Sequence, residues 1–246
     1  MDISVVLITK NEAHIIEKTL QSLQPEFRDI VIVDSGSTDE TISICKNFNC
    51  HIIETNWDGY GANKNKGINA AKNDWILSLD ADEHPTDELK KNILQLSGKN
   101  DEEVFTIRRI NFFCNKKIRF GEWGQDKPIR VFNRKKIWWN NDAVHEKLIL
   151  PNNYLIKKIP GHILHFTVQD KQEFIQKITG YARMNAGKYA ASGKKSNFIK
   201  QYVSPLFSFI SNYIFRLGFL DGKEGFIIAK YNAYYTFLKY KYLGEM

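Results

Sequence analysis

Short apolar runs alternate with segments of helical periodicity over the first hundred residues. The apolar runs predict buried β-strands at 3–8, 30–34, 50–54 and 75–79. The segments between them predict helices at 12–23, 37–48, 61–72 and 86–96. Ser37 and Glu40 have the spacing of a capping box at the start of the second helix. Strands that alternate with helices indicate an α/β fold with a mostly parallel sheet covered by helices on both faces.

The pattern changes after residue 100. Shorter and more polar runs predict strands at 104–113, 117–122, 129–132 and 163–166. From Lys171 the apolar spacing is helical, and the segment from Lys194 is rich in aromatic residues. No linker of low complexity separates these parts, so we place a domain boundary near Asp170. The chain is thereby divided into 1–170 and a helical C-terminal region, 171–246.

Composition and charge narrow the class of protein. The 246 residues include 35 Lys and Arg against 28 Asp and Glu, and this net charge of +7 suits an anionic partner such as a nucleotide or a lipid head group. The 3 cysteines form no CxxC pair, which disfavours a disulfide framework or structural zinc and favours a reducing cytosol. The sequence has neither a signal-peptide pattern nor the run of ~20 apolar residues of a membrane-spanning helix. We therefore expect a cytoplasmic location.

Three polar clusters follow predicted strands. They are Thr9 to Glu12, Asp34 to Asp39, and Asp80 to Asp82. Because ligands of an open parallel sheet bind beyond the carboxyl ends of its strands, we expect the three clusters to meet in one site. Each cluster taken alone also suits a structural role, since Asn11 and Ser37 are good helix caps.

Asp80 and Asp82 are the most informative pair. Two carboxylates separated by one residue repel each other unless a cation or a donor-rich ligand lies between them. Mg²⁺ or Mn²⁺ fits, because these ions combine carboxylates with substrate phosphates. The alternative is a solvated acidic turn.

No glycine-rich phosphate loop occurs, which disfavours dinucleotide dehydrogenases and P-loop kinases and leaves Lys64 and Lys66 as candidate phosphate ligands.

Several motifs occur in a characteristic order. TKNE, VDSGSTDET, GANKNKGINAA and WILSLDADE follow one another over residues 1–97, and in this order they resemble the nucleotide-sugar half of the family 2 glycosyltransferases. The later motifs EWGQD, IRVF, VHE and GFLDG resemble the branch that acts on the bacterial lipopolysaccharide core. The resemblance implies a GT-A fold, with a donor half at 1–97, an acceptor half at 98–170 and a helical C-terminal extension.

The resemblance also implies roles for the strand-end residues. Thr9 and Glu12 take positions that contact the base and ribose of the donor, and Asp34 takes the position of a carboxylate that binds uracil or ribose. Asn11 is a further candidate donor-binding residue. Lys64 and Arg130 are implied near the anionic part of the donor. Asp80 matches the ligand of ribose or of a metal-bound water, and Asp82 matches the direct ligand of Mg²⁺ or Mn²⁺. The family often has an aromatic residue where this chain has Lys10, which leaves the nucleobase open.

The family inverts the configuration of the sugar, which requires a base for the acceptor hydroxyl. We expect Asp126 to be that base, with Glu122 as the second choice and a salt bridge to Lys127 or Arg130 as the structural alternative. His145 is a candidate metal ligand or a structural histidine. For His162 and His165 we favour packing over metal binding.

These observations predict transfer of glucose or a similar sugar from a UDP-linked donor to a lipopolysaccharide-core or other surface glycan. Two alternatives stay open. One is a haloacid-dehalogenase-type phosphatase, whose DxDx[TV] pattern fits Asp80 to His84 except for His84. The other is a non-catalytic glycan-binding module.

The aromatic and basic residues after Lys194 suit an anionic membrane surface or a homodimer interface. Nothing in this segment resembles a nucleic-acid-binding motif. We therefore expect the protein to be peripheral at the inner face of the cytoplasmic membrane or to form a dimer.

Overall fold

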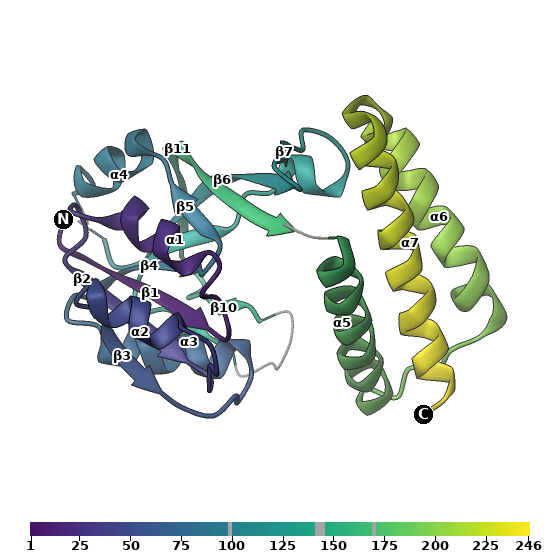
Figure 1. Cartoon of the computed structure of the whole chain (residues 1–246), viewed down its shortest axis with the longest axis horizontal. Helices are drawn as coiled ribbons and strands as arrows, with labels where there is room; N and C mark the ends of the chain where they lie inside the picture. The colour runs from purple at the N-terminus through teal and green to yellow at the C-terminus, as the bar shows by residue number, and fades with distance from the viewer. Residues whose placement is uncertain (98–99, 141–145, 169–170) are drawn as a thin grey trace. The chain divides into compact units, whose positions relative to one another are not determined.

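The computed structural model describes residues 1–97, 100–140, 146–168 and 171–246, which form two compact units (Figure 1). The first unit contains residues 1–109 and 127–165, and the second contains 110–126 and 166–246. Two long strands, β6 (Glu103–Phe113) and β11 (Leu155–Val168), begin in the first unit and end in the second. The second unit takes in the predicted helical region together with residues 110–126.

A mixed sheet forms the centre of the first unit, in the order β3-β2-β1-β4-β8-β6-β11-β5. Its other strands are β1 (Ile3–Thr9), β2 (Asp29–Asp34), β3 (His51–Glu54), β4 (Trp75–Asp80), β5 (Glu83–Pro85) and β8 (Ile129–Asn133). Strands β1 to β4 pair in parallel, whereas β8 pairs antiparallel with both β4 and β6, and β5 pairs antiparallel with β11. The predicted strands of the first hundred residues are confirmed, and the second half of the chain extends the sheet with antiparallel strands.

Helices cover both faces of this sheet. They are α1 (Ile16–Leu23), α2 (Thr41–Asn47), α3 (Tyr60–Ala70) and α4 (Asp87–Leu94). Val5 and Leu7 of β1 pack in one core cluster with α1 and α4, while Val6 packs in another with Ile68 of α3. This alternation follows from the two-residue repeat of a strand. A hairpin of β9 (Trp138–Trp139) and β10 (Leu148–Ile149) lies beside the sheet.

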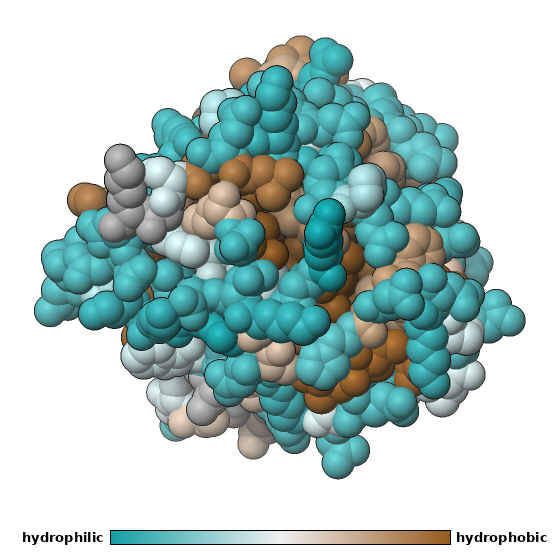
Figure 2. Space-filling view, turned by 90° about the vertical axis from the view of Figure 1, so that its left-hand side faces the viewer, coloured by the Kyte–Doolittle hydropathy of each residue, from teal (hydrophilic) through white to brown (hydrophobic). Residues whose placement is uncertain are grey.

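Glycine at position 67 permits close packing of α3 on the sheet. A Cβ atom there would lie 2.4 Å from Cγ1 of Val6 and 2.9 Å from Cγ2 of Val33. No side chain fits at these distances, so α3 packs directly on β1 and β2. The face of the first unit seen in Figure 2 is mainly hydrophilic, with apolar residues in limited areas between polar ones.

Two local predictions are wrong. Ser37 does not cap a helix: its hydroxyl donates to Oδ2 of Asp34 at 2.5 Å, and α2 begins only at Thr41. The predicted strand 117–122 is reduced to β7 (Lys116–Lys117), and Glu122–Gln125 form the 3-10 turn η1. The hydroxyl of Ser37 also accepts from the N–H of Asn11, and backbone N–H groups of 119–122 donate to Asp221 and Asn212, so contacts outside each segment replace the local pattern.

The second unit is mainly helical. Its helices are α5 (Lys171–Ala191), a continuous helical stretch from η2 (Ile199–Val203) through α6 (Ser204–Ile210) to η3 (Ser211–Phe215), the turn η4 (Gly218–Asp221) and α7 (Gly222–Gly244). α7 packs against both α5 and α6. The core of the second unit includes Phe113, Phe174 and Ile228. None of the helices in the described ranges alone has the length and apolar composition of a membrane span; Ile199–Phe215 and Gly218–Gly244 pass that test as a pair, bent by 70°.

Candidate active site

The three polar clusters meet at the carboxyl edge of the parallel strands. Thr9 pairs in register with Asp34, and Ile8 pairs with Asp80, so the ends of β1, β2 and β4 lie side by side. The hydroxyl of Thr9 donates to Oδ2 of Asp34 at 3.0 Å. The predicted convergence of these clusters is therefore confirmed.

Hydrogen bonds hold the loops after β1 and β2 together. Asp34 is fully buried, and its Oδ1 accepts from the backbone N–H groups of Gly36 at 3.0 Å and Ser37 at 2.8 Å. Asn11 has a positive φ of 57°, and its side-chain oxygen accepts from the N–H of Thr38 at 2.8 Å. Asp34 and Asn11 thus shape the two loops. The donor contacts predicted for Thr9, Asn11, Glu12 and Asp34 stay predictions.

Asp80 lies among three positive side chains. Its Oδ1 is 3.2 Å from Nζ of Lys64, and its Oδ2 is 2.8 Å from a terminal guanidinium nitrogen of Arg130 and 3.9 Å from one of Arg109. Burial alone would raise the pKa of Asp80, but the charges of these three side chains outweigh it and hold that pKa well below its ordinary value. Asp80 is therefore ionised at neutral pH.

Three further residues belong to this cluster. Glu83 is completely buried, and its Oε1 accepts from Arg130 at 2.5 Å and from Arg109 at 2.8 Å. Glu146 accepts from Nζ of Lys64 at 2.7 Å. Neither Glu83 nor Arg109 is predicted from the sequence as a residue of the site. The sequence does contain a signal for each residue: Glu83 is a third acidic residue directly after Asp82, and Arg109 is a charged residue inside the predicted strand 104–113.

The cluster is close to electrically balanced. Among its described side chains, Asp80, Glu83 and Glu146 are acidic, and Lys64, Arg109 and Arg130 are basic. Burial lowers the pKa of His84 to about 4, so this neighbouring imidazole is neutral at physiological pH and adds no charge. A bound diphosphate would therefore bring negative charge that these groups do not already neutralise.

Asp82 lies beside His165. Its Oδ1 lies 3.3 Å from Nε2 of His165, which β11 places opposite Glu83 of β5. The candidate ligand His145 lies outside the described residues. Within the described ranges, no group of three or more His, Cys, Asp or Glu has a metal-binding arrangement. Asp82 and His165 thus form a contact between two side chains of metal-ligand type, although the sequence favours a packing role for His165.

The candidate bases lie in the second unit. Glu122 is exposed in η1, and Asp126 follows η1 directly and is half-buried. The turn is tightly folded, because a Cβ at Gly124 would lie only 2.1 Å from the carbonyl oxygen of Arg119. The roles of Asp126 and Glu122 in catalysis stay predictions.

Buried polar side chains hold the loop that carries these two carboxylates. The carboxylate of Asp221 accepts from the N–H groups of Arg119 at 3.0 Å and Phe120 at 2.8 Å. The side-chain oxygen of Asn212 accepts from the N–H of Glu122 at 3.1 Å. Asp221 belongs to the GFLDG motif, so this motif fixes the backbone just before the candidate bases. From the sequence alone, this motif is only typical of the lipopolysaccharide-core branch, and its structural role is not predicted.

Comparison with known proteins identifies the family. The profile of the family described as "Glycosyl transferase family 2" matches residues 4–157. The chain belongs to this family. This membership supports glycosyl transfer as the activity, and it overturns the alternative of a haloacid-dehalogenase-type phosphatase.

Relatives of this glycosyltransferase align over nearly its whole length. An "Uncharacterized glycosyltransferase" of Rickettsia bellii is 25% identical over 256 residues, covering 99% of this chain and 86% of the relative. The "Lipopolysaccharide core biosynthesis glycosyltransferase LpsC" of Rhizobium meliloti is 28% identical over 246 residues, covering 97% of this chain and 90% of LpsC. The similarity thus includes the helical C-terminal region.

Solved structures show the same fold. S. aureus TarS 1–349, crystallised in complex with UDP, aligns with a TM-score of 0.51 at 16% identity and covers 100% of this chain and 90% of the TarS chain. Its complex with UDP-GlcNAc aligns with a TM-score of 0.50 at 14% identity, covering 100% and 91%. The predicted GT-A fold with a helical C-terminal region is confirmed.

We expect Glu83→Gln to destabilise this glycosyltransferase by about 3 kcal/mol, because the change leaves two largely buried guanidinium groups with one fewer negative partner. The midpoint of urea unfolding should fall while its slope stays constant. The control is Asp74→Asn, which removes an exposed partner 2.7 Å from Lys135 and should leave the midpoint almost unchanged. Equal midpoints for Glu83→Gln and the unsubstituted protein would contradict a stabilising role for Glu83.

Proposed function

We propose that this glycosyltransferase moves glucose or a similar hexose, with inversion, from a UDP-linked donor to a lipopolysaccharide-core or other surface glycan. The observation that carries the proposal is the meeting of Thr9, Asp34, Asp80 and Asp82 at the ends of three parallel strands. In such sheets this edge is where nucleotides bind.

The donor is proposed from the basic side chains beside Asp80 and from the solved relatives. TarS, which shares the fold, has been crystallised with UDP and with UDP-GlcNAc. In this chain Lys64 is almost completely buried beside Asp80 and lies 4.6 Å from the ring centroid of Trp139. A cation held in this way, with Arg130 on the other oxygen of Asp80, suits the anionic part of a nucleotide sugar.

The acceptor is proposed from the relative LpsC, whose name places it in lipopolysaccharide core biosynthesis. Its similarity to this chain extends through the GFLDG motif and the helical region. The order of the later motifs supports the same acceptor class.

A divalent cation fits the described residues. The carboxylate of Asp82 and the imidazole of His165 offer one oxygen and one nitrogen ligand, and Mg²⁺ or Mn²⁺ commonly takes its remaining ligands from substrate phosphates and water. When bound, the ion would neutralise charge that grows on the departing diphosphate. Asp80, already paired with three cations, would serve to position Lys64 and Arg130.

Inversion requires removal of a proton from the acceptor hydroxyl, on the sugar face opposite the departing nucleotide. We assign this step to the carboxylate of Asp126, with Glu122 as the second choice. Anchoring of the preceding backbone by Asp221 and Asn212 supports the assignment, because a base is effective only when it is held in a fixed position.

A donor screen tests the proposed function. The protein is incubated with Mn²⁺ or Mg²⁺ and with UDP-, GDP-, ADP- and dTDP-hexoses, and the released nucleoside diphosphate is measured. We expect release of UDP from one UDP-hexose, faster when a lipopolysaccharide-core acceptor is added. Absence of release from every donor would contradict the proposal and support the glycan-binding module instead.

A further inference from the structure

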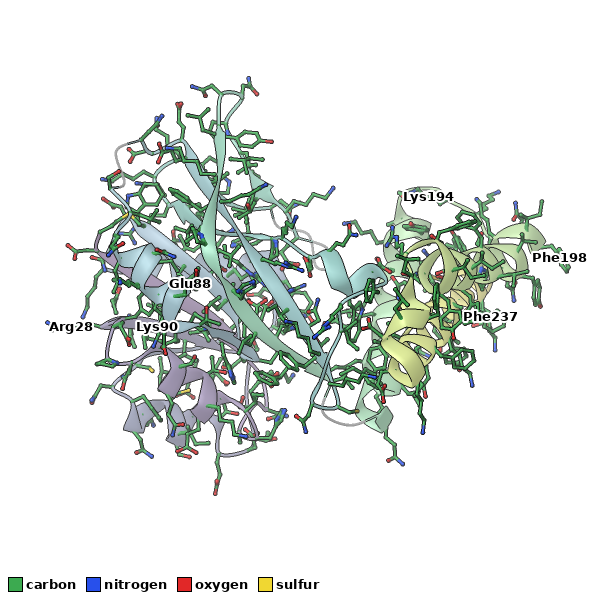
Figure 3. All side chains as sticks on the ribbon, turned by 90° about the horizontal axis from the view of Figure 1, so that it is seen from above. Arg28, Glu88, Lys90, Lys194, Phe198 and Phe237 are labelled. Atoms are coloured by element: carbon green, nitrogen blue, oxygen red, sulfur yellow. The ribbon has the colours of Figure 1, made fainter. Side chains whose placement is uncertain are left out.

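The helical stretch Ile199–Phe215 exposes apolar residues along one side. Ile199, Tyr202, Val203, Leu206, Phe207 and Ile214, here called the outer stripe, are between 48 and 66% exposed. Ile199, Val203 and Phe207 are four residues apart, and Ile214 follows about two turns later, so these side chains lie along one side of the helical stretch. Phe198, 73% exposed just before this stretch, points away from the helices in Figure 3.

The opposite side of the same stretch packs on the protein, where Phe209 and Tyr213 contact the ring of Phe226. Asn212 is buried; it donates to the carbonyl oxygen of Ser208 at 3.1 Å and accepts from the backbone of Glu122. The stretch therefore packs Asn212, Phe209 and Tyr213 against the protein and leaves a second apolar side outward, where a helix that faces water would be polar. An apolar surface of this extent, unlike the mainly hydrophilic face in Figure 2, marks an interaction surface.

The charges around the outer stripe select its partner. Residues 194–220 contain Lys194, Lys195, Lys200 and Arg216 and no Asp or Glu. Lys194 and Lys195 precede the helical stretch, and Arg216 follows it. The apolar face therefore has cations at both of its ends, the pattern of a helix that lies in the surface of an anionic bilayer.

A second copy of the chain fits less well. In a symmetric dimer the same surface is used twice, so these four cations would approach their own counterparts with no acidic residue in 194–220 to neutralise them. Anionic lipid head groups remove this repulsion. The helical stretch is also one-sided, because Asn212, Phe209 and Tyr213 lie against the protein, which suits a helix lying in the surface and not one that crosses the bilayer.

We propose that the outer stripe of Ile199–Phe215 docks in the plane of an anionic lipid bilayer. The stretch of about 25 Å would bury its apolar side chains at the boundary between head groups and acyl chains, while the flanking cations contact lipid phosphates. This docking goes beyond the proposed sugar transfer and does not depend on it.

Vesicle flotation of the full-length protein tests the docking without donor or acceptor. We expect the protein to bind vesicles of phosphatidylglycerol and phosphatidylethanolamine, and to bind them less as the salt concentration is raised. It should bind neutral phosphatidylcholine vesicles only weakly. The double variant Leu206→Ser, Phe207→Ser should weaken binding at least about 100-fold, because two large apolar side chains no longer leave water. Both residues are exposed, so the fold should persist, as circular dichroism would verify.

Two further variants separate apolar from charge effects. Lys195→Gln with Arg216→Gln should weaken binding to the anionic vesicles about 25-fold, or about fivefold for each charge removed. The matched control is Leu155→Ser with Ile156→Ser, which alters two side chains of β11 that are 50% and 55% exposed and should leave binding unchanged. The proposal is overturned if the unsubstituted protein ignores anionic vesicles, or if Leu206→Ser, Phe207→Ser only converts a dimer into a monomer in analytical ultracentrifugation.

Discussion

Replacement of Asp82 by alanine should reduce sugar transfer by at least about 10³-fold while the fold persists. The expectation rests on the position of this carboxylate just after β4, where it lies 3.3 Å from His165. A ligand that holds a divalent cation against a departing diphosphate contributes several kcal/mol to the transition state. Transfer is measured as UDP released in the presence of acceptor, and folding is followed by circular dichroism.

The matched control is Asp87→Ala, which removes a carboxylate that is 96% exposed in the first turn of α4 and should leave transfer unchanged. EDTA should reproduce the effect of Asp82→Ala on the unsubstituted protein, and added Mn²⁺ should restore activity. Full activity in EDTA would contradict the metal role, and full activity of Asp82→Ala would contradict the assignment of this residue.

Asp126→Asn should lower kcat at least about 10²-fold with little change in the affinity for the donor. Asparagine keeps the size of the side chain but does not accept the proton of the acceptor hydroxyl, so the loss should fall on the chemical step. Steady-state kinetics with both substrates give kcat, and UDP binding by calorimetry gives the donor affinity.

Glu122→Gln provides the comparison. Glu122 is exposed, and its Oε2 lies 3.3 Å from the side-chain nitrogen of Asn232. We expect a small effect from this variant. A larger loss of kcat in Glu122→Gln than in Asp126→Asn would show that Glu122 is the base.

Regular features of the fold followed from the sequence because they depend on local periodicity. The strands β1 to β4 and helix α3 lie close to where the apolar pattern predicted them. The predicted meeting of Thr9, Asp34 and Asp80 held because parallel strands joined by helices must end at the same edge of their sheet.

Errors arose where distant contacts decide local structure. Residues 117–122 have strand-like composition but form a turn. Asp221 binds the N–H of Phe120, 101 residues away along the chain, and Asn212 binds the N–H of Glu122, 90 residues away. The capping pattern of Ser37 failed because its hydroxyl donates to Asp34 and accepts from the N–H of Asn11, 26 residues away along the chain. A local pattern contains no information about such partners.

The sequence by itself determined the family, the α/β order of the first hundred residues and the candidates Asp80, Asp82 and Lys64, because motifs and periodicity are properties of short segments. Only the tertiary structure decided that Lys64, Arg109 and Arg130 surround Asp80, that Asp82 faces His165, and that the apolar side of Ile199–Phe215 points outward. Pairings between segments far apart in the chain, and the side of a helix that is covered, depend on how the elements pack. Packing is a property of the whole chain.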